Sequence, residues 1–541
     1  MSDNEFAIPI KSTPAELPFG MEIPSPSSGC DVASAAAFAK RRKSMELLKW
    51  VFSFPALLGT FLIGRVFYEG RNFFVDPDLW WHIKNGQNIL ATHHWPTTDP
   101  YSSTVFGQPW IDCEWVGDVL LAAVARIGGG LGLDILLISL ASIIMLAIYY
   151  YGTLRSGNCK AGFVAALILC SLAFASFTLR PQMLGYLYLI ALLVFLEQFR
   201  RGKPYLLLML PPLFLLWINS HGSWIIGLGA FFVTLASGFW TFRLGGVEAV
   251  KWTNKERMQL ELALLGSLAM LPLTPYGTEP IAYPFEVALK LPIGVANVME
   301  WQSMPFHLVG GKMFLALLLG FIVVQAFFRY VWRLDELALF VFGTMMACLH
   351  VRFLLVFVPF FAPILATVFA RWLPPYDRKK EHYVLNSALM AAVAVCLVWY
   401  FPTRAQIGSR ISARFPTGTT KYLLDHPVSG RLFNSYGFGG YLIGAGQRVF
   451  VDGRSDPYER GGALSDYFHI TYLKPGAFIV LNRYGISACL LETSEPLATV
   501  LANSRDWRRL ASDEVSVLYV RREHAVGENA LPLMAAEKGK E

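Results

Sequence analysis

Long runs of apolar residues recur along most of the chain and are separated by short polar segments. A helix needs about 20 apolar residues to cross the hydrocarbon core of a bilayer. The pattern predicts about eleven such spans, near residues 47–68, 131–152, 161–178, 183–199, 204–219, 224–242, 258–274, 312–331, 335–350, 353–371 and 384–401. The sequence is therefore expected to fold as a mainly α polytopic membrane protein.

The pattern changes after the last apolar run. Short β-rich runs alternate there with runs of helical character, which is typical of a small α/β domain. The expected strands are Val449–Asp452, Ile486–Leu491 and Val515–Val520, and the expected helices are Gly462–Tyr472 and Glu495–Ala502. We expect a disordered tail at 1–45, a transmembrane domain at 46–401, an α/β domain at 402–525 and a flexible tail at 526–541.

Composition excludes an ordinary soluble protein, because 54% of the residues are hydrophobic, only 16% are charged and the mean hydropathy is +0.44. The net charge of +7 does not indicate a nucleic-acid partner, since the basic residues cluster in alternate loops. By the positive-inside rule these loops and the N-terminus are cytoplasmic, and an odd number of spans puts the C-terminal domain outside. The basic clusters are Lys40–Lys43, Arg155 with Lys160, Arg200–Lys203, Arg243–Arg257, Arg329–Arg333 and Arg371–Lys380.

The polar motifs lie in the other set of loops, on the predicted outer face. They are Asp76–His82, Arg180–Gln182, Asn219–Gly222, Pro275–Gly277, Glu300–Trp301, His350–Arg352 and Asp452–Arg454. A carrier with a site at the bilayer midplane would place ionisable groups within its spans, and here the spans hold few. The distribution favours an active site at the outer membrane surface.

The first outer loop, residues 69–117, carries the densest chemistry. Helical spacing predicts an amphipathic helix over 78–91 that lies along the membrane, with Trp80 and Trp81 as interfacial anchors. Asp76 and Asp78 are candidates to bind a divalent cation (Mg or Mn) or to deprotonate an acceptor, with His82 assisting one turn later. The structural alternative is that Asp76 merely caps this helix.

A second helix is expected to begin near Trp110. Glu114 and Asp118 lie four residues apart on it, and Glu114 is a candidate second acid near the first pair, unless it belongs to a solvated helix face. Asp99, within a segment rich in Pro and Ser, is expected to be a turn residue.

These elements resemble the GT-C superfamily of membrane glycosyltransferases. The resemblance is carried by Asp76-Pro77-Asp78 just after the first span, by an outer loop with two surface helices, and by the Trp81-His82 and Asp99-Pro100-Tyr101-Ser102 elements. Within the superfamily the loop looks most like the oligosaccharyltransferase catalytic subunit and the polyprenyl-phosphate-sugar transferases, and the order of the motifs is similar to that in a family of bacterial GT-C-like proteins.

The resemblance implies a polyprenyl-phosphate-sugar donor, a glycan, lipid or protein acceptor from the outside, a catalytic carboxylate in the first loop, and a location in the bacterial cytoplasmic membrane. One feature departs from the oligosaccharyltransferase pattern. That pattern has a second acidic motif in a later outer loop, where this chain has Phe177–Gln182, and the departure weakens the case for a tightly held metal.

Without a metal, the leaving phosphate needs Arg, His or backbone N–H groups. Arg180, Arg352 and His221 are the candidates, although both arginines can instead snorkel to headgroups and His221 can cap or pack a helix end. Glu300 is a further acid. Asp452 and Arg454 are expected to form a polar lip on the acceptor side, or else to stabilise the C-terminal domain.

Three functions remain open. The first is transfer of a sugar from a lipid-phosphate donor to an outer acceptor. The second is a non-enzymatic role as a transporter of lipid-linked glycans or as an assembly scaffold, and the third is a polymerase or ligase of such glycans, which differs only in its acceptor.

Overall fold

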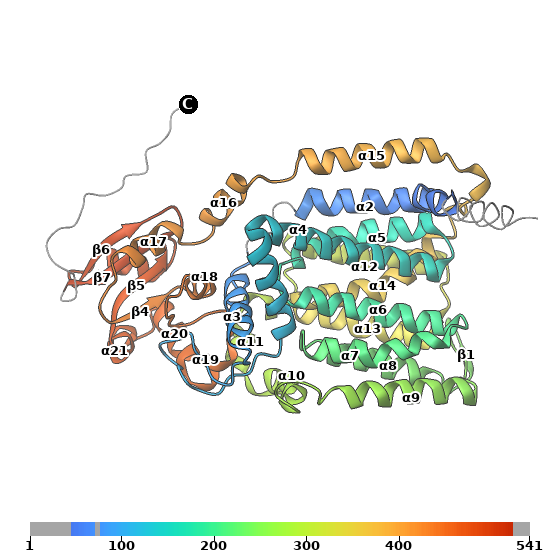
Figure 1. Ribbon diagram of the computed structural model, residues 1–541. Coiled ribbons are helices and arrows are strands. Elements are labelled where there is room, and N and C mark those ends of the chain that lie inside the picture. The colour runs from blue at the N-terminus through green and yellow to red at the C-terminus, as the bar shows by residue number, and fades with distance from the viewer. Residues whose placement is uncertain (1–44, 71–75, 523–541) are drawn as a thin grey trace, which may run out of the picture.

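The computed structural model describes residues 45–70 and 76–522, and most of them are helical. Ten helices of 9 to 19 residues and the second part of α4 lie side by side as one bundle (Figure 1). A helix overlaps each segment expected to span a membrane. These helices are α2 (Phe54–Gly70), α4 (Trp115–Ser156), α5 (Cys159–Ala173), α6 (Gln182–Arg200), α7 (Leu210–Ile218), α8 (Trp224–Ser237), α9 (Asn254–Met270), α12 (Val309–Phe327), α13 (Leu334–Leu349), α14 (Leu354–Phe369) and α15 (Tyr383–Trp399).

By length and apolarity, four helices among the described residues can cross a membrane, or up to six if two bent pairs each form one span. The four are Trp115–Ser156, Gln182–Arg200, Val309–Phe327 and Val351–Phe369, and the bent pairs are Met45–Val51 with α2 and α15 with α16 (Arg404–Ser412). Shorter apolar helices at Cys159–Leu172, Pro204–Ile218 and Trp224–Ser237 lie among them. The chain is an integral membrane protein of mainly helical structure.

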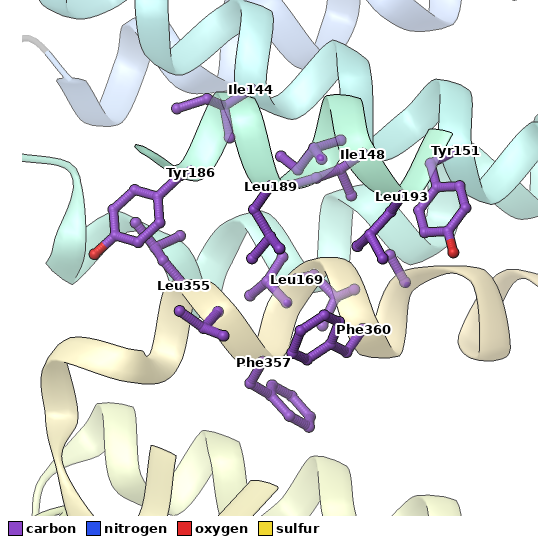
Figure 2. Packing of buried hydrophobic residues seen from close by; sticks show 14 of the residues in the cluster. Ile144, Ile148, Tyr151, Leu169, Tyr186, Leu189, Leu193, Leu355, Phe357 and Phe360 are labelled. Carbon is purple, nitrogen blue, oxygen red and sulfur yellow. The ribbon is translucent and has the colours of Figure 1, made fainter. Parts of the chain in front are cut away.

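The bundle is held together around α14, which is apolar on all sides and buried along almost its whole length. Ile144 and Ile148 of α4 and Leu189 of α6 lie on one side of α14, and Phe357 points from α14 to the opposite side (Figure 2). The Phe357 ring packs there against Phe314 of α12. Two prolines interrupt the hydrogen bonding of α14, which neighbouring helices make tolerable in a membrane. The close packing of this core fixes the helix ends relative to one another.

The polar loops expected on the outer face gather at one end of the bundle (Figure 1). The expected helix over 78–91 is confirmed as α3 (Leu79–Thr92), whereas the second helix begins at Trp115 rather than near Trp110. At Gly129, with φ 56°, the path of α4 breaks, so that its first part crosses the bundle end and its second part enters the bundle. The same end carries α10 (Glu279–Lys290) and α11 (Pro292–Asn297).

The opposite end of the bundle carries a small sheet and a buried ion network. Its strands are β1 (Phe242–Leu244), β2 (Val247–Ala249) and β3 (Trp332–Arg333). Arg155 pairs there with Glu336 at 2.7 Å, Arg200 with Asp335 at 2.8 Å, and Arg333 with Glu197 at 2.7 Å. Arg155, Arg200 and Arg333, which belong to the basic clusters of the positive-inside pattern, are therefore each paired with a buried acid at this end of the bundle.

Beyond α15 the chain forms a mixed four-stranded sheet of order β4-β5-β7-β6, in which β4 and β5 are parallel and the other pairs antiparallel. The strands are β4 (Arg431–Asn434), β5 (Ile486–Glu492), β6 (Trp507–Ser512) and β7 (Ser516–Arg521). The helices are α17 (Thr417–Asp425), α18 (Gly439–Gly444), α19 (Asp456–Arg460), α20 (Ala463–Thr471), α21 (Ala477–Arg483) and α22 (Pro496–Ala502). Short 3₁₀ turns are η1 (Phe174–Ser176), η2 (Pro204–Met209), η3 (Met299–Trp301), η4 (Val351–Phe353), η5 (Arg378–Lys380) and η6 (Tyr436–Phe438).

The strands expected at Ile486–Leu491 and Val515–Val520 are confirmed as β5 and β7, and the expected helices as α20 and α22. Val449–Asp452 is not a strand of this sheet. Its Val449 instead forms a parallel bridge with Ser102 of the first outer loop, whose neighbour Ser103 donates its backbone N–H to the Val449 carbonyl at 2.8 Å. The tails expected at 1–45 and 526–541 lie outside the described residues, apart from Met45.

The expectation that Trp80 and Trp81 anchor the loop in the membrane interface is wrong. Trp80 makes edge-to-face contacts with Phe415 and Tyr441, two residues that come after the last bundle helix in the chain. Trp81 is only 6% exposed and packs in an apolar cluster with Trp110 and Leu442. The loop helix α3 is thus covered by α4 on one side and by the C-terminal region on the other, which removes its apolar face from lipid.

Candidate active site at the α3 end of the bundle

Three carboxylates meet one guanidinium where α3 begins. Arg180, just ahead of α6, places Nε 2.7 Å from Asp76 Oδ1 and one Nη 3.1 Å from Asp78 Oδ2. The same Nη lies 2.7 Å from Glu300 Oε1, which belongs to η3. The structure thus joins Asp76, Asp78, Arg180 and Glu300, which the sequence separates widely.

The helix-cap alternative for Asp76 is correct only in part. Asp76 Oδ1 accepts a hydrogen bond from the backbone N–H of Asp78 at 2.8 Å, which orders the turn into α3. Asp78 itself is the N-cap residue, yet its side chain makes no capping hydrogen bond. The Asp78 carboxylate therefore faces Arg180 instead of the helix backbone, and it remains available for chemistry.

The protonation of this cluster is set by burial and by Arg180. Burial raises the pKa of Asp78 to about 6, against the lowering effect of Arg180. Burial also raises the pKa of Glu300, but Arg180 and Arg352 outweigh it and leave that pKa below its usual value. Burial lowers the pKa of Arg180, and the carboxylates outweigh it, so Arg180 stays charged. Asp78 is the member of the cluster that can exchange a proton near neutral pH.

The residues present do not fit the divalent cation that Asp76 and Asp78 are expected to hold. Both carboxylates already bind the Arg180 guanidinium. Within residues 45–70 and 76–522, no group of three His, Cys, Asp or Glu side chains has the geometry to bind a metal ion. A guanidinium charge occupies the position between the carboxylates.

A second polar cluster lies between α3 and α4 and is almost fully buried. His82 Nδ1 lies 2.5 Å from Asp118 Oδ1, and Asn85 donates to Asp118 at 2.9 Å and to Asp112 at 2.8 Å. Burial raises the pKa of Asp112 and lowers the pKa of His82, because it disfavours the charged form of each group. His82 and Asn85 on α3 therefore form a polar face that covers Asp118 of α4 and Asp112, which precedes α4.

Glu114, the residue before α4, lies between two histidines. Its Oε2 is 3.8 Å from His82 Nε2, and its Oε1 is 3.4 Å from His221 Nε2. Burial raises the pKa of Glu114 to about 7 and lowers that of His221 to about 3. Although these distances resemble ion pairs, both imidazoles are neutral near pH 7 and Glu114 is the group that titrates there. Glu114 precedes α4 instead of lying on its surface, and its half-buried side chain faces both imidazoles, which argues against the solvated-face alternative.

His221 is held by its own turn. Its Nδ1 lies 2.9 Å from Ser223 Oγ, which also accepts a hydrogen bond from Trp217 Nε1 at 2.9 Å. Gly185 of α6 lies directly against this pair, and a Cβ atom there would overlap Ser223 Oγ. The imidazole is thereby fixed with Nε2 toward Glu114.

Arg352 lies in η4, near Glu114 and Glu300. Its guanidinium stacks on the Trp301 ring, 4.3 Å from the centroid, and its carbonyl accepts a hydrogen bond from Tyr186 at 3.3 Å. Among the described residues it forms no ion pair, yet its charge acts on the pKa of Glu300, Glu114 and His221. Among the described residues Arg352 is therefore a cation at this end of the bundle that has no carboxylate in contact with it.

Asp452 and Arg454 occupy a different position from the expected acceptor-side lip. Arg454 is 5% exposed and Asp452 is fully buried, and the two form a bidentate pair at 2.8 and 2.7 Å. Arg454 also lies 2.9 Å from Asp99 of the first loop and stacks on Trp110. Asp99 is a turn residue as expected, since it accepts hydrogen bonds from Ser102. These contacts join the C-terminal region to the loop and support the structural alternative for Asp452 and Arg454.

Asp112 and Tyr436 are site residues that the sequence does not single out. Asp112 lies in a segment that reads as the start of a helix, and only the fold shows that it shares Asn85 with Asp118. Tyr436 donates a hydrogen bond to the Gly453 carbonyl at 3.3 Å. Burial raises the pKa of Tyr436, and the nearby Asp78 carboxylate raises it further. The glycines near Tyr436 are the sequence feature that could have indicated this contact. Gly440 and Gly453 allow the C-terminal backbone to lie against Pro77 and Asp78.

No family model matches the sequence, and no curated protein matches it. Solved structures do. The archaeal oligosaccharyltransferase AglB from Archaeoglobus fulgidus, in complex with an inhibitory peptide and a dolichol-phosphate, is 11% identical with a TM-score of 0.49, and the match covers 87% of this chain and 74% of that one.

ArnT from Cupriavidus metallidurans, bound to undecaprenyl phosphate, is 14% identical with a TM-score of 0.47, over 86% of this chain and 97% of ArnT. The arabinofuranosyltransferase AftD from Mycobacteria is 12% identical with a TM-score of 0.47, over 86% of this chain and 41% of AftD. All three are GT-C glycosyltransferases, the superfamily that the first outer loop resembles.

Proposed function

We propose that this protein is a membrane glycosyltransferase that moves a sugar from a polyprenyl-phosphate donor to an acceptor on the non-cytoplasmic face. The observation that carries the proposal is a convergence of complementary groups at one end of the bundle. Burial raises the pKa of Asp78 to about 6 and that of Glu114 to about 7. Arg352 stacks on Trp301, and no carboxylate within residues 45–70 and 76–522 forms an ion pair with it. Acid–base groups poised near neutral pH beside a cation suit transfer from a phosphate leaving group.

Asp78 acts as the general base. The acceptor nucleophile attacks the anomeric carbon, its proton passes to Asp78, and the bond from that carbon to the phosphate oxygen breaks with the electron pair going to the phosphate. Arg180 holds the Asp78 carboxylate at 3.1 Å and keeps it in its ionised form against the effect of burial. Asp76 shares Arg180 and fixes its orientation.

Arg352 binds the phosphate on which negative charge develops. Arg180 contributes less to that task than the sequence suggests, because three carboxylates already surround it. Glu114, when protonated, and the neutral His221 add hydrogen-bonding groups beside Arg352 without adding negative charge.

The proposed topology has eleven spans in the bacterial cytoplasmic membrane, with a cytoplasmic N-terminus and the C-terminal α/β domain outside. It is supported by the basic residues at the bundle end away from α3 and by the polar motifs at the α3 end. Reporter fusions after residue 402 and within the α8–α9 loop test it, since they are expected to report opposite sides.

The activity is tested with purified protein in lipid vesicles and a panel of labelled polyprenyl-phosphate sugars, with membrane glycolipids and peptides as acceptors. We expect a labelled covalent product and equimolar free polyprenyl phosphate. Asp78→Asn is expected to abolish both. If the Asp78→Asn and Asp76→Asn proteins fold and still transfer sugar at the wild-type rate, the assignment is wrong.

The same vesicles separate the alternatives. A transporter would move the labelled lipid between leaflets without covalent product, and a polymerase or ligase would give products that contain several donor units or a preformed glycan. If the wild-type protein moves the labelled lipid but never forms a covalent product, the transferase proposal is wrong and the transporter alternative takes its place.

A further inference from the structure

The Arg180 guanidinium forms ion pairs with three acids that come from two distant parts of the chain. Asp76 and Asp78 precede α3, while Glu300 belongs to η3. Two acids bind a single Nη atom, at 3.1 Å and 2.7 Å, and the third binds Nε at 2.7 Å. The Asp76 side chain is 2% exposed and that of Arg180 18%, so water screens the cluster poorly.

Without Arg180 these acids would repel one another at short range. Three ionised carboxylates in a partly buried site attract a hard divalent cation, which prefers oxygen ligands and neutralises more charge than a proton does. Asp76 is fixed by the Asp78 backbone, whereas the Glu300 side chain is 36% exposed and can adjust its position. The cluster therefore offers the oxygen ligands that such a cation prefers, while Arg180 holds them in positions that do not have metal-binding geometry.

We propose that Arg180 is a built-in cation that takes the place of a divalent metal between Asp76, Asp78 and Glu300. The wild-type protein accordingly does not bind a divalent cation at this cluster, and loss of the guanidinium converts the three carboxylates into a divalent-cation site. Only the catalytic consequence, that transfer does not require a metal, rests on the proposed function. The cation-binding statement depends on the contacts of Arg180 alone.

Arg180 is a positioning residue in this scheme, since it acts through Asp78. Its positive charge is fixed by covalent structure and stays in place while substrates exchange. A bound metal would leave open coordination positions for a substrate oxygen, and a guanidinium offers only N–H donors. The phosphate must then find its cation elsewhere, which agrees with the unpaired charge of Arg352.

The experiment measures Mn²⁺ binding to the purified full-length protein by electron paramagnetic resonance, with the thermal unfolding midpoint as a second readout. We expect Arg180→Ala to bind one Mn²⁺ at least about tenfold more tightly than wild type and to be stabilised by it. Arg180→Lys, which keeps the charge, should not bind. The double variant Arg180→Ala with Asp78→Asn should lose the gained binding.

Two results would overturn the proposal. One is a wild-type protein that binds Mn²⁺ and loses it on Asp78→Asn, and the other is an Arg180→Ala protein that binds no more Mn²⁺ than wild type. If Arg180→Ala fails to fold, Mn²⁺ during expression and purification is expected to restore folding, and failure to restore it also counts against the proposal. In the transfer assay, wild-type activity is expected to survive EDTA. An absence of any transfer would remove the proposed function and leave the Mn²⁺ result interpretable.

Discussion

The Asp78 carboxylate lies directly against the backbone of Gly453, so closely that a Cβ atom at position 453 would overlap it. Gly440 meets the Pro77 carbonyl in the same way. Residues that follow the last bundle helix therefore form one wall of the candidate site, although Asp76 and Asp78 come from the first loop.

Gly453→Ala should displace the Asp78 carboxylate from Arg180 because the added methyl group occupies its position. We expect transfer activity to fall by roughly tenfold or more, the size of effect that a small misplacement of a reacting group produces. The rate of sugar transfer measures it. Gly408→Ala is the control, because a Cβ atom there meets nothing within 4 Å. Equal activities of the two variants would show that the contact does not position Asp78.

Arg352→Gln should weaken donor binding, because it removes the unpaired cation proposed to contact the phosphate. A charge-assisted hydrogen bond contributes about 1.5–3 kcal/mol, so the KM for the donor is expected to rise roughly 10- to 100-fold. Titration of undecaprenyl phosphate, followed by quenching of tryptophan fluorescence, gives an independent affinity. Arg352→Lys should recover part of the loss. An unchanged donor affinity in Arg352→Gln would leave the phosphate without the proposed ligand.

The rate of transfer should depend on pH as a narrow bell. Asp78 must be ionised to act as base, so activity rises with pH through its pKa of about 6. Glu114 contributes as the protonated acid, so activity falls as pH rises through its pKa of about 7. Glu114→Gln keeps a hydrogen-bond donor that does not titrate, and it is expected to remove the falling limb. A falling limb unchanged in this variant would exclude Glu114 as its origin.

Arg454→Met should destabilise the protein, because it leaves the buried acids Asp452 and Asp99 without their cation. Breaking a buried pair on one side costs about 3–5 kcal/mol. The midpoint of thermal unfolding should fall, and proteolysis after residue 402 should become faster. Arg378→Ala, which removes an exposed pair with Glu46, is the control and should leave both unchanged. Full stability of Arg454→Met would mean that the network does not hold the C-terminal region in place.

The sequence predicted the helices well because an apolar run of about 20 residues indicates a membrane helix by itself, without knowledge of its neighbours. It also predicted that Asp76, Asp78, Glu114, Arg180, His221, Glu300 and Arg352 belong to one face, and the structure brings them to one end of the bundle. Sequence position could not show which charge faces which. Arg180 reads as a phosphate ligand until its three acids are seen, and Trp80 and Trp81 read as lipid anchors because their covering partners lie far along the chain.

The pairing between the first loop and the C-terminal region also constrains how the protein is made. Ser103 and Val449 are 346 residues apart, which at about 5–20 residues per second means a delay of roughly 20–70 seconds during translation. Throughout that interval Asp99 has no Arg454, and Trp81 and Trp110 lack their apolar cover. The site is therefore assembled last, after the helices that support it, and a ribosome that stops before residue 454 leaves a membrane-inserted chain without a finished active centre.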